Sequence, residues 1–225
     1  MYKNIYLMRG KEDSLKRFHP WVFSGAIQRK DDGIEDGDIV NVITSDDKFI
    51  AVGHYQEGSI TVRVLSFKNI EINDDFWSSR LSSALEMRRS IGIADNAENN
   101  TYRLVHGEGD NLPGLIIDVY GETAVMQAHS IGVHLCRKEI ASQLVKVMDK
   151  RIKNIFYKSE TTLPFMDPEN GFLYGGSEDN TAIENGLKFH VDWLKGQKTG
   201  FFVDQSDNYS LLDKYIKNKS IMTMC

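Results

Sequence analysis

The 225-residue sequence has only two cysteines, Cys136 and Cys225, and they lie far apart along the chain. A disulfide framework or a structural zinc site needs more cysteines than this, so we expect two reduced thiols. Proline is also scarce, at 4 residues, and charged residues make up 26% of the chain. These values are typical of a folded protein and exclude a disordered or collagen-like chain.

Long apolar stretches are missing as well. No run approaches the roughly 18 residues that cross a bilayer, and the opening segment MYKNIYLMRGKEDSLKR carries too much charge for a secretory signal. We therefore expect a cytoplasmic protein that does not associate with a membrane. The net charge of −5 argues against nonspecific coating of nucleic acid. Residues 1–70 nevertheless hold equal numbers of basic and acidic residues, so this segment can present a basic face.

The first seventy residues contain short strand-like segments separated by turn-forming sequences such as DDG and SDDK. The segments are NIYLMRG, WVFSGAI, DIVNVIT, KFIAVGHY and SITVRVLSF. In the last one, the alternation places Val64 and Leu65 on opposite faces, as in a half-buried strand. This pattern predicts a small barrel-like β domain over residues 1–70.

Residues 71–180 mix helical and strand periodicity. Apolar residues from Phe76 to Ile91 follow helical spacing, with Asp74 or Asp75 as the expected N-cap. A second helix is expected over residues 133–148. Strands are expected in YRLVHGEGDNLPGLIIDVYG, ETAVMQAHS and IKNIFYKS, and a loop in TTLPFMDPENGFLYGG. The combination predicts a central α+β domain with helices packed on one face of a sheet.

Residues 181–225 form a third segment. AIENGLKFHVDWL predicts a β-hairpin that turns at Asn185 and Gly186. Asp204 is the expected cap of a helix over DQSDNYSLLDKYIKN. The closing SIMTMC is expected to be a strand.

KGQKTGFFVDQ, residues 195–205, is the first candidate site, and we call it the junction motif. Its glycines let a ligand or backbone come close, while Gln197 and Thr199 offer short polar contacts. Phe201 and Phe202 alternate, so one ring can enter the core while the other covers a ligand. The same residues also fit a loop-to-helix connection with no ligand. A phosphate loop is excluded, because it needs four residues before an adjacent Gly-Lys-Thr.

KRFHPWVFSG, residues 16–25, is the second candidate, and we call it the basic-aromatic segment. Lys16, Arg17 and His19 alternate with aromatic rings that include Trp21. Cations and flat rings suit a phosphate backbone and stacked bases. A core strand with solvated flanks is the alternative, and the residues alone do not decide. The six histidines lack the spacing of metal ligands, so no metal site is expected.

Several of these motifs, in this order, resemble the PUA-containing, S-adenosyl-L-methionine (SAM)-dependent methyltransferases of large-subunit rRNA, of the cytosine-C5 type. HPWVFSGAI and SITVRVLS resemble the PUA domain, RLVHGEGDNLPGLIIDVYG the central domain, and KGQKTGFFVDQ the junction that follows. The resemblance implies RNA contacts from the basic-aromatic segment, at Lys16, Arg17, His19 and Trp21. It also implies that part of the junction motif lies near the methionine end of SAM, at Gln197, Thr199, Gly200, Phe201, Phe202, Asp204 and Gln205.

In that family a class I methyltransferase domain follows the junction, and SIMTMC resembles its first strand. The Gly-rich loop and the catalytic cysteine would lie beyond Cys225, so we expect a truncated chain with no catalytic residue, inactive alone and with little affinity for SAM. One departure is that Ser206 and Tyr209 stand where the family has arginines. A non-enzymatic PUA-type RNA-binding module is the alternative. The residues decide neither the target nucleotide nor whether the protein is a homodimer.

Overall fold

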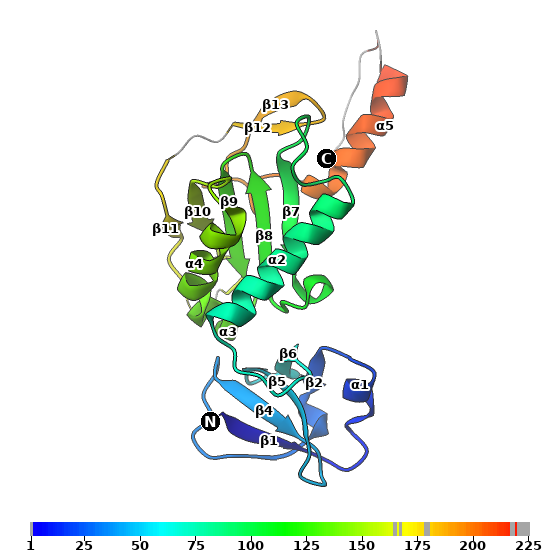
Figure 1. Ribbon diagram of the computed structural model, residues 1–225, viewed down its shortest axis with the longest axis vertical. Helices are drawn as coiled ribbons and strands as arrows, with labels where there is room; N and C mark the ends of the chain where they lie inside the picture. The colour runs from blue at the N-terminus through cyan, green and yellow to red at the C-terminus, as the bar shows by residue number, and fades with distance from the viewer. Residues whose placement is uncertain (1, 164–165, 167, 178–180, 217–218, 220–225) are drawn as a thin grey trace.

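The computed structural model describes residues 2–163, 166, 168–177, 181–216 and 219. These residues form a lower unit built on a six-stranded sheet and an upper unit built on a five-stranded sheet, with a two-stranded hairpin at the far end of the upper unit (Figure 1). The strand predicted at residues 220–225 lies outside the described part of the chain.

The lower unit contains a short helix and six strands. They are β1 (Lys3–Leu7), α1 (Asp13–Lys16), β2 (Trp21–Phe23), β3 (Ile27–Lys30), β4 (Ile39–Ile43), β5 (Phe49–Tyr55) and β6 (Ile60–Ser66). The sheet order is β2-β6-β5-β4-β1-β3, and β1 and β4 are parallel. Side chains from β1, β2, β4, β5 and β6 meet in one apolar core, as the barrel-like prediction requires. The edge strand β3 was not predicted separately, because its sequence IQRK has little apolar alternation.

Strand β6 is buried on both faces, so the prediction of a half-buried strand is wrong. Val64 belongs to the core of the lower unit, whereas Leu65 belongs to the core of the upper unit. Arg80 of α2 (Asp74–Ser90) reaches across and donates to the carbonyl oxygen of Leu65 at 3.1 Å. Packing between the two units therefore covers the face of β6 that a single domain would leave to solvent.

The upper sheet carries helices α2 and α4 on one face (Figure 1). Its elements are β7 (Thr101–His106), β8 (Leu115–Tyr120), β9 (Thr123–Ala128), α3 (Ile131–Leu135), α4 (Arg137–Met148), β10 (Asn154–Tyr157) and β11 (Gly171–Tyr174). The order is β11-β10-β9-β8-β7. Strands β9 and β10 are parallel and are joined through α3 and α4, while the other neighbours are antiparallel. This arrangement confirms the predicted helices on one sheet face.

Two local predictions in the upper unit are wrong. Asn73, and not Asp74 or Asp75, caps α2: it is extended, and its side chain accepts a hydrogen bond from the amide of Phe76 at 3.1 Å. All three adjacent residues are of a type that caps helices, so the sequence alone does not show which of them has the extended backbone that an N-cap needs. The segment predicted as a loop contains β11, which pairs with the edge of β10. A four-residue edge strand among turn residues carries too short a pattern to stand out.

The opposite face of the upper sheet is covered by the segment that leads from the hairpin to the junction motif. The hairpin strands are β12 (Thr181–Glu184) and β13 (Leu187–His190), and the turn residues Asn185 and Gly186 have φ of 51° and 75°, which confirms the prediction. Trp193 then packs against Tyr120 and Phe156 from the sheet. The chain continues through a 3-10 turn, η3 (Val203–Gln205), into helix α5 (Ser206–Ile216), which projects from the body (Figure 1).

Candidate functional site

Thr199 anchors the junction motif to the upper sheet. Its side chain is fully buried, and its hydroxyl donates to Oδ2 of Asp118 at 2.7 Å. The hydroxyl of Tyr120 lies 2.7 Å from the same Thr199 oxygen. Because a carboxylate only accepts, the Thr199 proton goes to Asp118 and the Tyr120 hydroxyl donates to Thr199. Burial and the nearby Asp118 carboxylate raise the pKa of Tyr120, which keeps this donor protonated.

Asp118 is a fully buried carboxylate in the middle of strand β8. The guanidinium of Arg103 on β7 donates to both of its oxygens, from Nε at 2.8 Å and from Nη2 at 3.0 Å. A paired and hydrogen-bonded charge of this kind is tolerated in a protein interior, whereas an unpaired one is not. The hydrogen bond to Asp118 also raises the pKa of Arg103.

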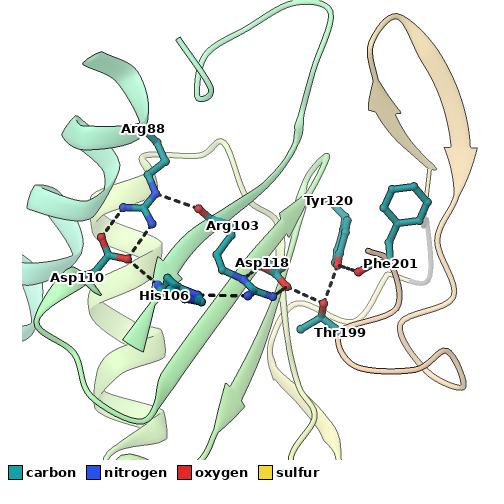
Figure 2. Close-up of polar contacts among 8 residues, drawn as sticks. All are labelled: Arg88, Arg103, His106, Asp110, Asp118, Tyr120, Thr199 and Phe201. Atoms are coloured by element: carbon teal, nitrogen blue, oxygen red, sulfur yellow. Dashed lines mark hydrogen bonds and ion pairs between the residues drawn. The ribbon is translucent and has the colours of Figure 1, made fainter. Parts of the chain in front are cut away.

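The same network continues to helix α2, so that one chain of polar contacts joins α2 to the junction motif (Figure 2). Nη1 of Arg103 lies 3.3 Å from Nδ1 of His106, and the His106 amide donates to Asp110 at 2.6 Å. Asp110 accepts two hydrogen bonds from Arg88, which also donates from Nε to the Arg103 carbonyl at 3.0 Å. The junction motif is thus tied to strands β7 and β8 and, through them, to helix α2.

A second cation holds the start of the junction motif. The ammonium of Lys158, next to β10, is buried and donates to the carbonyl oxygens of Trp193, at 2.7 Å, and Gly196. Gly200 has φ of +119°, and a Cβ atom there would come within 2.8 Å of the Cα of Trp193. The chain therefore folds back on itself so closely that only glycine fits at this position.

The remaining residues predicted to bind the cofactor lie toward the surface. Phe201 packs against Phe189 at 5.4 Å between ring centroids, while the ring of Phe202 is 40% exposed. These positions match the prediction that one ring enters the core. The backbone carbonyl oxygen of Gln197 accepts a hydrogen bond from the amide of Gly200 at 2.8 Å.

Asp204 lies inside the 3-10 turn η3, and helix α5 begins two residues later, so the prediction that Asp204 caps the helix is wrong. The reason is that the helix is preceded by a tighter turn, which the apolar spacing of α5 does not reveal. Asp204 instead lines a hollow of about 630 Å³ between α2, β7 and η3. Gln205 follows it, with Nε2 at 3.5 Å from an Asp204 carboxylate oxygen.

The hollow has a size typical of ligand sites. Its apolar lining residues are Met87, Ile91, Ile93, Tyr102 and Val203, and its charged and polar ones include Arg103, His106, Asp204 and Ser206. The hollow therefore meets the polar network at Arg103 and the junction motif at Asp204. An apolar floor with a carboxylate and a guanidinium at its edge can hold a flat, partly polar group.

The basic-aromatic segment belongs to the lower unit and lies around edge strand β2. Lys16 forms an ion pair with Glu12 at 3.3 Å, whereas the guanidinium of Arg17 has no ion-pair partner within the described part of the chain. The ring of His19 lies 5.8 Å from that of Trp21, centroid to centroid. Among the four predicted RNA-contact residues, the structure therefore shows contact between His19 and Trp21, while Lys16 and Arg17 are exposed on the preceding turn.

Trp21 also has a second role that the sequence did not predict. Its indole N–H donates to Oε1 of Glu108 at 2.8 Å, and Glu108 belongs to the 3-10 turn η2 (Gly107–Asp110) of the upper unit. The residue therefore connects the lower and upper units.

Comparison with known proteins now gives the lower unit a name. Residues 5–67 match the family model of a PUA-like domain. Among curated proteins, the chain is similar to Ribosomal RNA large subunit methyltransferase I of Aliivibrio fischeri, with 33% identity over 229 residues that cover 99% of this chain and 57% of the relative. The protein of that name from Vibrio campbellii is 34% identical over 97% of this chain and 55% of its own length. The chain thus spans little more than half the length of these relatives.

Two solved structures share the fold. A candidate SAM-dependent methyltransferase from Streptococcus mutans superposes with a TM-score of 0.77 at 21% identity, over 93% of this chain and 53% of that one. A candidate methyltransferase solved in complex with SAH superposes with a TM-score of 0.76 at 22% identity, with the same coverage. Within the described ranges, no helix has the length and apolar character to span a membrane, and no cluster of side chains has the make-up of a metal site.

The PUA-like domain meets the upper unit through a tightly packed joint. Gln56 accepts a hydrogen bond from the amide of Ile131 at 3.1 Å, and a Cβ atom at Gly132 would lie 2.2 Å from Cγ of His54. His54 is buried and stacks on Trp77 of α2 at 6.2 Å. Burial, and to a lesser degree the charge of Arg63, lowers the pKa of His54 to about 4.

Sequence reasoning missed the residues that organise both regions, namely Arg103, Asp118, Lys158, His54 and Gly132. One signal was available for Asp118: an acid inside the apolar run LIIDVY must be paired if that strand is buried. No comparable signal marks the others, because each acts through a partner that is distant in sequence.

Proposed function

We propose that this chain provides the RNA-binding and supporting parts of a SAM-dependent methyltransferase that acts on large-subunit rRNA in the cytoplasm. One observation carries the proposal: 97–99% of the chain aligns, at 33–34% identity, with proteins named Ribosomal RNA large subunit methyltransferase I. The PUA-like domain supports it, as does the superposition of this chain on 53% of a solved candidate SAM-dependent methyltransferase. The cytosine-C5 target rests on the resemblance of the sequence motifs.

Each segment has a part in this proposal. Residues 1–70 bind rRNA through Lys16, Arg17, His19 and the ring of Trp21. Residues 71–180 form the support, and residues 181–225 lead to the SAM site. Within the junction motif, the buried Thr199 holds the loop in place, and the more exposed residues contact the cofactor.

The side chains near η3 fit the methionine end of SAM. Asp204 offers a carboxylate for an ammonium group, and the ring of Phe202, 40% exposed, binds cations: the Lys198 ammonium lies 4.4 Å from its centroid, where a sulfonium cation can take its place. Gly200 lets the loop fold tightly onto the backbone of Trp193, which fixes the path of the chain that leads to these side chains. Bound SAM supplies an electrophilic methyl group, while the residues of this chain orient it and exclude water.

The 225-residue chain provides the first test of these roles. Calorimetry should detect no micromolar binding of SAM, because the junction motif offers only one wall of a pocket. A labelled fragment of large-subunit rRNA should bind to the same chain. Micromolar binding of SAM would contradict the proposed division of the site, and absence of RNA binding would contradict the role of residues 1–70.

The second candidate function is a non-enzymatic RNA-binding module. The exposed basic and aromatic side chains around β2 favour it, since they need no cofactor. An assay of protein made from the complete reading frame, with labelled SAM and rRNA, distinguishes the two functions. Methyl transfer supports the enzyme, and RNA binding without transfer supports the module.

A further inference from the structure

A groove of about 230 Å³ runs along the joint between the PUA-like domain and the upper sheet. Its side-chain walls come from both units, with Trp21, Ile60 and Arg63 on one side and Glu108, Leu115 and His129 on the other. Gly107 and Gly114 contribute backbone alone, which keeps the groove open at the turn before β8. Groups from two folded units therefore converge on one narrow space.

Arg63 is the positive charge of this groove. It lies on β6 directly opposite Trp21 on β2, which places it beside the basic-aromatic segment. Its guanidinium forms no hydrogen bond or ion pair with another described residue, and burial lowers the pKa of Arg63, with the charge of Glu108 acting in the opposite direction. A partly dehydrated cation without a fixed partner is costly, and an anionic ligand relieves that cost.

His129 provides a second donor from the upper unit. It follows β9, the residue reaches solvent although its ring is partly desolvated, and its side chain forms no hydrogen bond within the described ranges. Burial, followed by the charge of Arg103, lowers the pKa of His129, with Glu108 acting in the opposite direction. The ring is therefore neutral near pH 7 and offers one N–H donor.

The groove also connects the two candidate sites. Trp21 belongs both to the basic-aromatic segment and to the groove, and the turn η2 lines the groove with Gly107 and Glu108 and the hollow that holds Asp204 with Gly109 and Asp110. The groove therefore lies beside the hollow, between the basic-aromatic segment and the junction motif.

We infer that this groove binds one phosphate of the substrate RNA, with Arg63 and His129 as its donors, and so carries the strand from the PUA-like domain to the junction motif. The inference rests on the proposed RNA-binding function. Glu108 is the acid within the groove, and Trp21 holds one of its oxygens. The negative charge of Glu108 repels the phosphate and limits the affinity for RNA. A substitution that removes this charge should therefore strengthen binding.

Fluorescence anisotropy of the full 225-residue chain with a labelled fragment of large-subunit rRNA tests this site. Arg63→Gln should weaken binding about tenfold and reduce the slope of log affinity against log salt by about 0.7, the value for one lost contact with a single strand. Glu108→Gln keeps an acceptor for Trp21 and should tighten binding. Arg29→Gln, on the opposite edge strand β3, is the matched control and should change neither quantity.

The outcomes separate the two proposals. If the wild-type chain does not bind the RNA, the proposed function fails. If it binds, and Lys16→Gln weakens binding while Arg63→Gln keeps wild-type affinity and salt slope, the RNA does not use the groove. If Arg63→Gln does not fold, Glu108→Gln decides, and unchanged affinity there overturns the inference.

Discussion

Replacing Thr199 with valine should release the junction motif from the upper sheet. Valine has nearly the same shape as threonine, so the substitution removes the hydroxyl without leaving a large cavity. The lost donation to the Asp118 carboxylate is worth about 1.5–3 kcal/mol, and the lost bond from Tyr120 about 0.5–1.5 kcal/mol. Because both partners are buried, we expect a total cost of about 2–4.5 kcal/mol.

Part of this cost should appear as local opening of the junction motif. The amides of Gly196 and Gly200 report on it, because each donates to a nearby carbonyl at 2.8 Å within the folded loop. Hydrogen exchange of this segment, followed by mass spectrometry, should accelerate by about thirtyfold or more, as 2 kcal/mol requires. Urea unfolding measures how much of the cost appears in the free energy of global unfolding.

Thr199→Ser is the control, since it keeps the hydroxyl and removes one methyl group worth about 1 kcal/mol. It should restore slow exchange in the junction motif even if it lowers stability slightly. The reasoning is refuted if the valine variant has wild-type stability within about 0.5 kcal/mol and wild-type exchange.

Three further predictions concern the joint and the RNA surface. Gly132→Ala places a Cβ atom 2.2 Å from Cγ of His54, so the melting temperature should fall by several degrees, for a loss of about 1–3 kcal/mol; an unchanged value would show that the joint is loosely packed. The pKa of His54 is about 4 in the folded chain and about 6.5 when unfolded, and Arg63, Trp77 and Cys136 face its ring. The free energy of unfolding should therefore decrease on the order of 3 kcal/mol as pH falls from 6.5 to 4, because the unfolded chain binds the proton first. Unfolding curves of His54→Gln should lack this pH dependence. Replacing Lys16 and Arg17 with glutamine should weaken RNA binding and flatten its salt dependence, and unchanged anisotropy titrations would remove both from the RNA surface.

Local patterns predicted much of the fold. The hairpin was predictable because Asn185 and Gly186 both accept a positive φ, and helix α2 because apolar residues recur on one face. The burial of Leu65 was not predictable, since it depends on a neighbouring unit that packs over the PUA-like domain. The sequence of one strand does not show whether another unit covers its second face.

The position of the candidate site along the chain was predicted, but the hydrogen-bond partners of its residues were not. The junction motif was identified, and Thr199 was expected to provide a short polar contact. Its partner Asp118 lies some eighty residues earlier, and spacing along the chain cannot pair residues at that distance. Trp21 shows the same limit, because its ring was predicted to meet RNA while its N–H binds Glu108 across the joint.

The most direct test of the account is methyl transfer. Protein made from the complete reading frame is incubated with tritiated SAM and large-subunit rRNA that lacks the modification, and the labelled nucleoside is identified after digestion. The account predicts label on C5 of a cytosine, and none when the 225-residue chain is used alone. No transfer by the complete protein, or label on another nucleoside, would contradict it.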